Sequence, residues 1–460
     1  MVKKYKNQKT MIKRRTFLKN ATVLASTALL PSCNFSTSEK SKRLRIANIG
    51  VGGMGAEDLD SISSHKMVDI VGLCDVDSDA LKKASMLFPN AKTYSDYRVL
   101  LEEMRDKIDA VVVSTPDHTH APASLMAMNL NKAVYCQKPL THHVSEAREM
   151  QLVAKEKNLV TQMGIQVHSF YDYKLATLLI KSGIIGKVSH VHAWSPKNWG
   201  YDGPMPTGSD PVPSNLDWNL WLGTAKERDY NKDFYHPFGD NNFFGNWRKL
   251  VDFGCGTLGD MGVHIFDTPY NALSLDVPKT IVNECREPNG FSFPENNKVT
   301  YVFPGTEQTT DELKWIWYDG ISAPEKHLDL ELPDNEKLHE QGAMFIGEKG
   351  KLYLPHFMIE PKLIVDGKYQ KMDIGKFNLG APVRDYDKER KFHYHEFVDA
   401  CLGKDKCSAP FSYASRLTET ILLGVIAGRF PGETLNWDKD LARFKEEKAN
   451  KYISGTYRDF

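Results

Sequence analysis

This sequence has few of the features that place a protein in a simple class. Beyond residue 33 it has no apolar run long enough to cross a bilayer as a helix, which excludes a polytopic membrane protein. It has no internal repeat and no low-complexity tract, which excludes a solenoid or an extended disordered chain. Its 7 cysteines lie mostly in apolar surroundings without regular spacing, so we expect no disulfide framework.

The sequence also lacks the spacings typical of a metal site. It contains no CxxC pair and no HExxH segment. Because none of its histidine pairs belongs to a Cys/His cluster, the sequence predicts no metal. These pairs are His118 and His120, His142 and His143, His190 and His192, and His393 and His395.

Acidic residues are absent from the start of the chain. The segment up to Cys33 contains 8 Lys or Arg and an apolar stretch that is too short for a membrane anchor but typical of an export signal. Arg14 and Arg15 resemble the twin-arginine motif, and Cys33 follows a segment that resembles a bacterial lipoprotein cleavage site. We therefore expect an export signal over 1–33, a polar tether over 34–43 and a lipid anchor at Cys33, with the protein in the periplasm or tied to the envelope.

Removal of such a signal would leave an acidic protein. Eight of the 59 Lys and Arg lie before Cys33, so 51 remain against 59 Asp and Glu, a net charge near −8. Nucleic-acid binding requires a basic surface, so nucleic acid is not expected as a partner. Two alternatives to lipidation stay open, an ordinary secretory signal with an incidental cysteine and a chain that is not exported.

A nucleotide-binding pattern follows the tether. An apolar strand pattern over 44–49 leads directly into a helical segment through Gly50-Val51-Gly52-Gly53-Met54-Gly55. The glycines of this GxGxxG motif allow a tight turn, close approach of a diphosphate and close packing of helix on strand. A second strand over 69–73 is followed by Asp75, whose carboxylate can bind ribose hydroxyls and favours NAD over a cofactor with a 2′-phosphate.

Strands and helices then alternate along the chain. Strand patterns at 110–113, 133–136 and 160–164 are separated by helical ones, which predicts a doubly wound parallel sheet over 44–165. The turns after two of these strands lie at the carboxyl edge of the sheet, where such folds bind their ligand. We expect the cofactor to contact Ser114, Thr115, Pro116, His118, His120, Gln137 and Lys138.

This alternation stops beyond residue 165. A helix is predicted over 171–181 and a strand over 188–194. Later segments indicate a second sheet, and the helical segments near 389–402 and 413–428 are expected to pack against it. The β-like segments are 279–285, 298–303, 313–318, 344–346 and 351–354.

Four motifs together resemble those of the Gfo/Idh/MocA oxidoreductases, and the resemblance runs from about residue 44 to the end of the chain. The motifs are GVGGMG at 50–55, STPDHTH at 114–120, QKP at 137–139 and GDMGVH at 259–264. The chain is similar to the exported branch of this family in bacteria that degrade glycans. Gln137 stands where the family pattern has glutamate, which leaves its role open, whereas the lysine that follows is kept.

The resemblance implies a fold, a cofactor and partners. It implies an α/β protein with an N-terminal Rossmann domain at 44–165 and a C-terminal α/β domain at 166–460 that holds a large open, mostly antiparallel sheet. It also implies NAD, a sugar or related small substrate, and a homo-oligomer, either a dimer or a tetramer. Within this frame Gln166, Trp247 and Arg248 are assigned to the cofactor side of the site, and His168 to the substrate side.

Asp260 and His264 are the main candidates for the chemistry, together with Lys138. Asp260 and His264 are four residues apart, so in a helix their side chains lie on one face and can both reach one hydroxyl-bearing carbon. We hypothesise that His264 is the acid/base with a pKa near the working pH, and that Lys138 stabilises alkoxide charge or shares in the proton relay. Asp260 would orient the substrate or the histidine. All three are expected to contact the substrate. Trp194 belongs to an aromatic region whose rings can stack on a sugar.

The predicted function is NAD-dependent oxidation of a secondary hydroxyl of a sugar or glycoside. Because the envelope has no free nicotinamide pool, we expect the cofactor to be bound tightly and regenerated within the site. One alternative is a redox-neutral cycle, as in the NAD-dependent glycoside hydrolases, lyases or epimerases of the same superfamily. A second alternative is a sugar-binding lipoprotein without catalytic activity.

Overall fold

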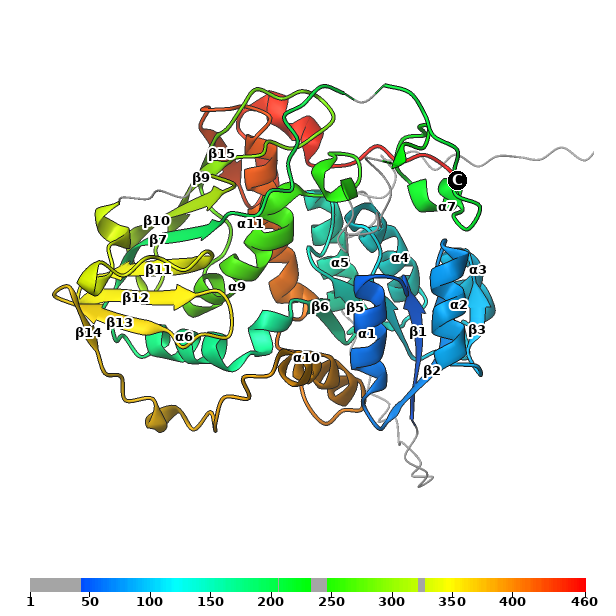
Figure 1. Cartoon of the computed structure of the whole chain (residues 1–460), viewed down its shortest axis with the longest axis horizontal. Helices are drawn as coiled ribbons and strands as arrows, with labels where there is room; N and C mark the ends of the chain where they lie inside the picture. Colours follow the sequence, from blue (N-terminus) through cyan, green and yellow to red (C-terminus); the bar gives the residue numbers. More distant parts are fainter. Residues whose placement is uncertain (1–42, 206, 233–245, 322–326) are drawn as a thin grey trace, which may run out of the picture. The chain divides into compact units, whose positions relative to one another are not determined.

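A six-stranded parallel sheet forms the first part of the computed structural model, which describes residues 43–205, 207–232, 246–321 and 327–460 (Figure 1). The strand order β3-β2-β1-β4-β5-β6 confirms the predicted doubly wound sheet. Its elements are β1 (Leu44–Ile49), α1 (Met54–Ser63), β2 (Val68–Cys74), α2 (Ser78–Leu87), β3 (Lys92–Tyr94), α3 (Tyr97–Glu103), β4 (Ala110–Val113), α4 (Asp117–Asn129), β5 (Ala133–Gln137), α5 (Val144–Glu156) and β6 (Thr161–Gly164).

Burial explains which strands of this sheet are visible in the sequence. All four residues of β4 are buried, because helices cover both faces of the central strands, and such strands are continuous apolar runs. The edge strand β3 was not predicted. It has only three residues, of which Lys92 and Thr93 are exposed, so it carries neither an apolar run nor a clear alternation.

The second sheet has ten strands in the order β14-β13-β12-β11-β7-β10-β9-β8-β15-β16. Strands β7 and β10 pair in parallel, and the other neighbours pair antiparallel, which confirms the expected large and mostly antiparallel sheet. Its strands are β7 (Val188–Ser195), β8 (Thr280–Glu284), β9 (Lys298–Pro304), β10 (Thr309–Asp319), β11 (Gly342–Gly347), β12 (Gly350–Pro355), β13 (Lys362–Val365), β14 (Lys368–Gln370), β15 (Leu435–Asp438) and β16 (Arg443–Phe444).

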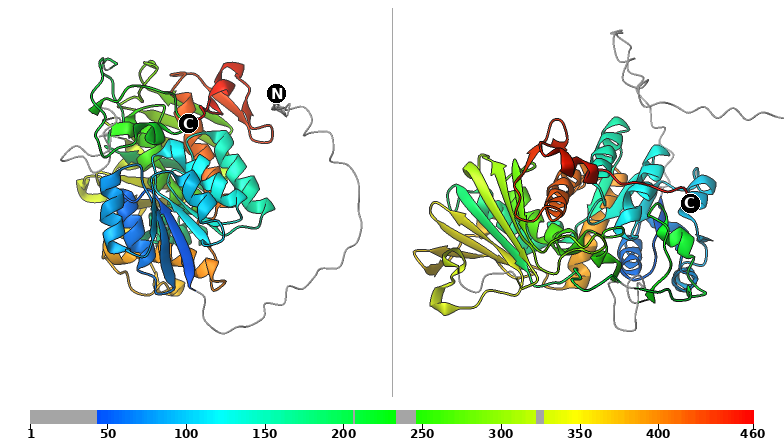
Figure 2. Two further views of the ribbon diagram at one scale, coloured as in Figure 1. Left: turned by 90° about the vertical axis from the view of Figure 1, so that its right-hand side faces the viewer. Right: turned by 90° about the horizontal axis from the view of Figure 1, so that it is seen from above.

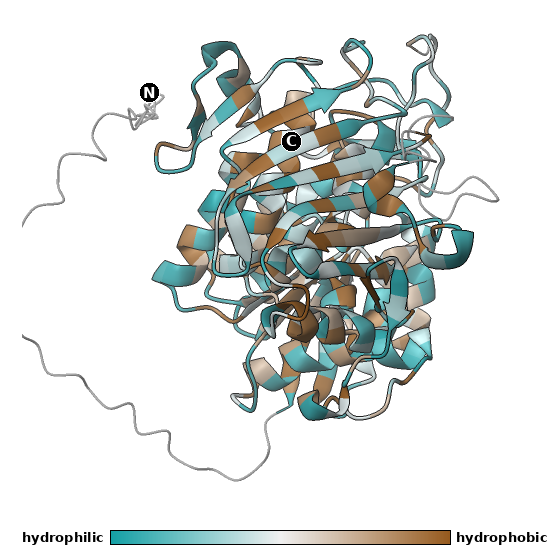
Figure 3. Ribbon diagram, turned by 90° about the vertical axis from the view of Figure 1, so that its left-hand side faces the viewer, coloured by the Kyte–Doolittle hydropathy of each residue, from teal (hydrophilic) through white to brown (hydrophobic). Residues whose placement is uncertain are grey.

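Helices cover one face of the second sheet and separate it from the first (Figures 1 and 2). Side chains of β9 alternate between buried and partly exposed, and Figure 3 shows the same alternation of apolar and polar residues along neighbouring strands. On the inner face Phe266 stacks on Trp315 with ring centroids 4.2 Å apart. The main helices that follow β6 in the sequence are α6 (Tyr171–Lys181), α7 (Trp218–Leu222), α9 (Val263–Ala272), α10 (Tyr386–Cys401) and α11 (Phe411–Ala427).

The predicted packing of α10 on the second sheet is wrong. Helix α10 packs against the parallel sheet and α1, where Tyr394, Phe397 and Val398 join a core cluster with residues of β1 and β4. Its Tyr394 ring stacks on Tyr135 of β5 with centroids 4.8 Å apart. Helix α11 does contact the second sheet at β8, but it also packs on α5 of the first domain. The apolar pattern of a helix shows that it is buried, not which sheet buries it.

The two sheets and their helices belong to one compact unit over 43–460. Helices α10 and α11 help to join the two sheets into this unit, because both come late in the sequence and yet pack on the first domain. Within the described residues no helix has the length and apolar character needed to cross a bilayer. The six cysteines of this part of the chain are free thiols.

Candidate active site

The turn between β1 and α1 is shaped by two glycines that cannot be replaced without displacement of backbone. Gly50 has a φ of +83°, and a Cβ there would lie 2.4 Å from the carbonyl oxygen of Ser114. A Cβ on Gly55 would lie 2.4 Å from the carbonyl oxygen of Gly50. The helix therefore begins against the end of β4 and directs its N-terminus at the space above the sheet edge, the arrangement that binds a diphosphate.

Asp75 holds this turn in place. Its Oδ2 accepts hydrogen bonds from the backbone N–H groups of Val51 at 2.8 Å and Gly52 at 3.1 Å, and its Oδ1 accepts one from Asp77 at 2.9 Å. Burial raises the pKa of the Asp75 carboxyl group, while these N–H groups lower it. A carboxylate has about four acceptor sites, so the predicted contact with a ribose remains open to Asp75.

A cavity of about 480 Å³ extends from this turn to the start of the second sheet. Its wall joins residues from both parts of the chain, and it contains most of the residues that the sequence predicted for the site. The predicted residues that line it are Gly50, Gly52, Met54, Gly55, Asp75, Ser114, Thr115, Pro116, His120, Gln137, Lys138, Gln166, Trp247, Arg248, Asp260 and His264.

Two predicted cofactor contacts lie outside this lining. Gly53 forms the turn itself, at the N-cap of α1. His118 is the second residue of α4 and is buried. Its Nε2 lies 3.1 Å from the carbonyl oxygen of Trp221, and its ring packs against those of Trp221 and Phe253. His120 does line the cavity, but both of its imidazole nitrogens lie 2.8 Å from backbone carbonyl oxygens, so they tie two turns together.

The two further substrate contacts that were predicted, His168 and Trp194, do not reach the cavity. His168 is buried against Asp267, with its Nδ1 2.9 Å from both carboxylate oxygens. Burial lowers the pKa of His168, but Asp267 raises it above the ordinary value. Trp194 is 2% exposed and donates its indole N–H to the carbonyl oxygen of His339 at 3.0 Å, on the outer face of the second sheet. Because side chains alternate along β7, Trp194 points away from α9 and from the cavity.

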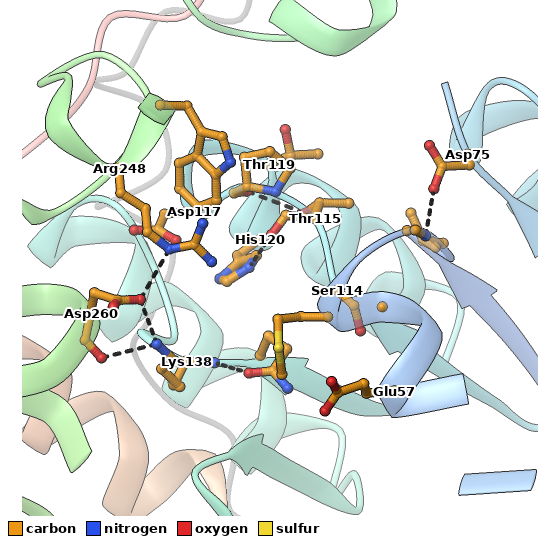
Figure 4. Close-up of a pocket in the computed structure, with 18 of the residues that line it drawn as sticks. Glu57, Asp75, Ser114, Thr115, Asp117, Thr119, His120, Lys138, Arg248 and Asp260 are labelled. Atoms are coloured by element: carbon orange, nitrogen blue, oxygen red, sulfur yellow. Dashed lines mark hydrogen bonds and ion pairs between the residues drawn. The ribbon is translucent and has the colours of Figure 1, made fainter. Parts of the chain in front are cut away.

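An ion-pair cluster occupies the end of the cavity near the second domain (Figure 4). Lys138, which follows β5, donates to Oδ1 of Asp260 at 2.7 Å and to its backbone carbonyl at 2.9 Å. Arg248 donates its Nε–H to the same Oδ1 at 3.1 Å. Burial opposes ionisation of Asp260, but the two cations hold its pKa far below the ordinary value. Asp260 is thus a carboxylate that fixes the Lys138 ammonium in the cavity wall.

His264 lines the same end of the cavity but does not pair with Asp260. Asp260 lies within the π-helical turn Leu258–Gly262, whereas His264 follows in α9, and the Asp260 carboxylate bonds to the two cations instead. Burial and the nearby Lys138 lower the pKa of His264 well below its usual value, so the expectation of a pKa near neutrality is wrong. Among the described residues its buried Nδ1 has no hydrogen-bond partner. The imidazole is therefore neutral and can accept a proton.

Three buried side chains in or beside the cavity were missed in the sequence. His356, at the end of β12, lines the cavity with its ring centroid 6.3 Å from that of His264. Asp117, the first residue of α4, lies beside Arg248 (Figure 4). Burial raises the pKa of Asp117 to about 7, although Arg248 and Lys138 oppose this shift. Only its place in the turn at the sheet edge could have indicated Asp117, and nothing local indicates His356.

The third missed residue, Asp58 in α1, explains the unusual Gln137. The Gln137 amide donates to both carboxylate oxygens of Asp58 at 2.9 Å, and the Ser114 hydroxyl donates to Oδ2 at 2.6 Å. Tyr394 of α10 also donates to this carboxylate. A glutamate at 137 would place a second acceptor-only group against a buried carboxylate, so a neutral amide donor suits this position.

Comparison with known proteins places the chain in a family. Residues 44–165 match the model of the oxidoreductase family's NAD-binding Rossmann fold, and residues 172–289 match the model of that family's C-terminal α/β domain. The chain therefore belongs to the Gfo/Idh/MocA oxidoreductase family, which confirms the resemblance found in its motifs. Its first domain has the NAD-binding Rossmann fold of that family.

Curated relatives match less than half of this chain, and the matched part covers less than half of each of them. An inositol 2-dehydrogenase of Salmonella paratyphi B is 28% identical over 153 residues, which is 32% of this chain and 45% of the relative. A glycosyl hydrolase family 109 protein of Shewanella woodyi is 28% identical over 165 residues, 34% of this chain and 35% of the relative.

Solved structures show the same fold at low identity. Levoglucosan dehydrogenase in complex with NADH and L-sorbose has a TM-score of 0.60 and 15% identity, and the match covers 86% of this chain and 98% of that one. myo-Inositol dehydrogenase from Lactobacillus casei with NAD(H) and myo-inositol has a TM-score of 0.55 and 18% identity, with 86% and 97% covered.

Proposed function

We propose that this protein oxidises a secondary hydroxyl of a sugar or glycoside, with NAD as the hydride acceptor. The observation that carries the proposal is the Lys138–Asp260 ion pair, which lies in the wall of the same cavity as the glycine turn. A nucleotide diphosphate at the turn would direct its nicotinamide along the sheet edge toward this ion pair. The sugar-like ligands named with structural neighbours support the choice of substrate class.

The residues of the cavity supply the proton chemistry. When bound, NAD supplies the hydride acceptor. The neutral imidazole of His264 accepts the hydroxyl proton, and the Lys138 ammonium, which Asp260 keeps in place, stabilises the negative charge that develops on the alcohol oxygen. Because the ammonium is held before reaction, little reorganisation is needed when this charge appears.

We propose NAD rather than NADP as the physiological cofactor. Asp75 borders the cavity at the end of β2, where the adenosine ribose lies in this class of fold. A carboxylate there accepts hydrogen bonds from ribose hydroxyls and repels a 2′-phosphate. Replacement of Asp75 by Asn should reduce the preference for NAD over NADP. The ratio of the two binding affinities in wild type and variant would measure this change.

A redox-neutral reaction is the second candidate. It is favoured by the match to a glycosyl hydrolase family 109 protein and by the proposed export, since an exported enzyme has no pool of free nicotinamide. In this version a sugar carbon is oxidised, a bond is broken or a centre inverted, and the hydride returns to the sugar. The same His264 and Lys138 serve both versions, and the cofactor stays bound throughout.

One experiment separates these candidates. The purified protein is denatured and the released NAD(H) is quantified, and the native protein is incubated with a panel of glycosides and analysed for keto-sugars, epimers and cleaved products. Stoichiometric NAD(H) with keto-sugar supports net oxidation, whereas cleaved or inverted product without change in NADH supports the redox-neutral cycle. Nucleotide without any turnover indicates a binding protein, and absence of nucleotide contradicts tight retention.

The assigned residues are tested by single-turnover reduction of the bound cofactor. Lys138→Met and His264→Ala should each slow the hydride step by roughly a hundredfold or more, because each removes a group that acts in the transition state. Lys132→Met is the matched control, since Lys132 donates to the Ile108 carbonyl at 3.0 Å and does not line the cavity. Near wild-type rates in both active-site variants would contradict the assignment.

Export and assembly are part of the proposal. Residues 1–42 lie outside the described part of the chain, so the signal, the tether and the anchor at Cys33 rest on the sequence. We expect Lys substitutions of Arg14 and Arg15 to leave the protein in the cytoplasm, and Cys33→Ala to abolish lipid labelling while cell fractionation still finds the protein exported. A dimer or tetramer is expected from the family, and light scattering of the purified protein measures this.

A further inference from the structure

Three potential metal ligands meet on the outer face of the second sheet. His192 lies on β7. Asp329 lies in the short turn η4 (Leu328–Leu330), and His327 directly precedes this turn. Nε2 of His192 is 3.2 Å from Oδ2 of Asp329, and Nδ1 of His327 is 3.8 Å from the same oxygen. All three ligand atoms lie within 4.8 Å of one another.

This cluster is separate from the dinucleotide cavity. His192 alternates along β7 with Val191 and Ala193, which face the inner core, so it points to the opposite side of the sheet. There its ring stacks on Tyr318, and its side chain is 1% exposed. None of the three ligand residues lines the cavity. The cluster therefore needs an explanation other than hydride transfer.

The hydrogen bonds of the cluster bring acceptor atoms close together. The backbone N–H of Asp329 donates to Nδ1 of His327 at 3.2 Å, so this nitrogen carries no proton, and an ion bound through it would replace this long hydrogen bond. Nε2 of His192 lies 3.2 Å from a carboxylate oxygen, where it either donates its own N–H to this oxygen or binds a cation together with it. Two imidazole nitrogens and a carboxylate oxygen thus surround a position that favours positive charge.

Neighbouring side chains hold these ligands in place. The Tyr318 hydroxyl lies 3.2 Å from Nδ1 of His192 and can fix the ring with Nε2 directed at the cluster. The Lys351 ammonium donates to the carbonyl oxygens of Leu328 at 2.8 Å and Asp329 at 3.0 Å, which fixes the turn on the sheet. Such outer contacts are typical of metal-binding histidines and carboxylates.

We propose that His192, His327 and Asp329 bind one divalent transition-metal ion, with Zn²⁺ the best match. In a tetrahedral zinc site, bonds of about 2.0–2.2 Å place ligand atoms about 3.3 Å apart. The His192–Asp329 separation of 3.2 Å matches this distance, and the His327–Asp329 separation of 3.8 Å would close by a small movement of the partly exposed His327 side chain. Two imidazole ligands disfavour Mg²⁺ and Ca²⁺, which prefer oxygen. The ion would fasten the turn to the central strand β7, and a water molecule would complete its coordination.

The proposal is tested first by metal titration. The full chain is stripped with a chelator, dialysed and titrated with Zn²⁺ by calorimetry, and separately with Co²⁺ while visible absorption is recorded. We expect one ion per chain, the intense absorption of tetrahedral Co²⁺ and an increase in Tm on Zn²⁺ addition, because an ion that binds only the folded state stabilises it. No stoichiometric binding of either ion would overturn the proposal.

Variants then locate the ion. His327→Ala and Asp329→Asn change partly exposed side chains, so the fold should be kept, as circular dichroism verifies, and each should weaken Zn²⁺ binding by roughly tenfold or more. His190→Ala is the matched control, because His190 lies on the same face of β7 but its Nδ1 is 3.0 Å from the Ser189 hydroxyl. Unchanged binding in both ligand variants, or equal loss in the control, would overturn this site.

Discussion

Individual side chains in the cavity differ in charge because their surroundings differ. Asp260 is buried beside two cations and stays ionised, whereas burial raises the pKa of Asp117 to about 7. Near neutral pH Asp260 is therefore ionised, while Asp117 is only partly ionised. The net charge of the cluster around Lys138 therefore changes with pH within the pH range in which enzymes work.

Asp117→Asn should change how stability depends on pH. The folded pKa of Asp117 is about 7 and lies above the ordinary value, so its contribution to stability is present below about pH 4 and is lost as the pH rises through 7. Relative to the Asn variant, the wild type should lose up to about 4 kcal/mol between about pH 4 and pH 8. Urea unfolding of both proteins across this range measures the difference, and parallel curves would contradict the assigned shift.

Gln137→Glu should destabilise the fold although it restores the family's residue. The new carboxylate would face buried Asp58, whose pKa burial already raises. We expect a loss of about 2–4 kcal/mol near neutral pH and a smaller loss at about pH 5, where one of the two groups is protonated. Gln137→Met removes the donor without adding charge, so its loss should vary less with pH. Equal pH profiles for the two variants would argue against this account.

At the scale of elements, the turn between β1 and α1 is far more constrained than the open turn at Gly183, which also has a positive φ. Gly50→Ala should abolish measurable NAD binding, because the new Cβ would collide with the Ser114 carbonyl oxygen at 2.4 Å. Gly183→Ala has a similar φ of +74° but nothing within 4 Å, so it should cost only about 1 kcal/mol and leave NAD binding intact. Fluorescence titration with NADH compares the two, and equal affinities would contradict the steric argument.

Helix α10 supports the first sheet from a distant part of the sequence. Phe397 of this helix is fully buried, so Phe397→Ala should cost about 3–5 kcal/mol and increase hydrogen exchange in β1 and β4. Phe392 lies on the same helix but is 48% exposed, and Phe392→Ala should change stability by less than about 0.5 kcal/mol. If both variants were equally stable, the packing of α10 would need revision.

On the scale of the whole molecule, the cavity joins both sheets, and α10 and α11 connect them again. A dinucleotide that binds only the folded state should therefore stabilise both. At a free concentration of 100 times Kd we expect about 2.7 kcal/mol of added stability. Hydrogen exchange should slow in β4 and in β10, and slowing in the first sheet alone would show that the sheets open independently. Gly50→Ala serves as the control that NAD should not stabilise.

Most of the alternating strands and helices from 44 to about 165 could be predicted from the sequence, although the edge strand β3 could not. Local signals suffice there, because glycines define the first turn and buried parallel strands are short apolar runs between helices. Lys138 could be chosen because its motif follows a strand at the sheet edge, whereas Asp260 and His264 were chosen on the preceding glycines and on the resemblance of GDMGVH to the family's motif. The sequence also determined the family and, through it, the cofactor.

Tertiary structure decided which of these side chains meet. His118, His168 and Trp194 carry the right chemical groups, but they bond to Trp221, Asp267 and His339, partners that no local pattern reveals. His356 enters the site only because the end of β12 packs near α9, which is far from it in the chain. A sequence pattern fixes the face on which a side chain lies, whereas its partners, and hence its charge and its role, depend on the folding of distant segments together.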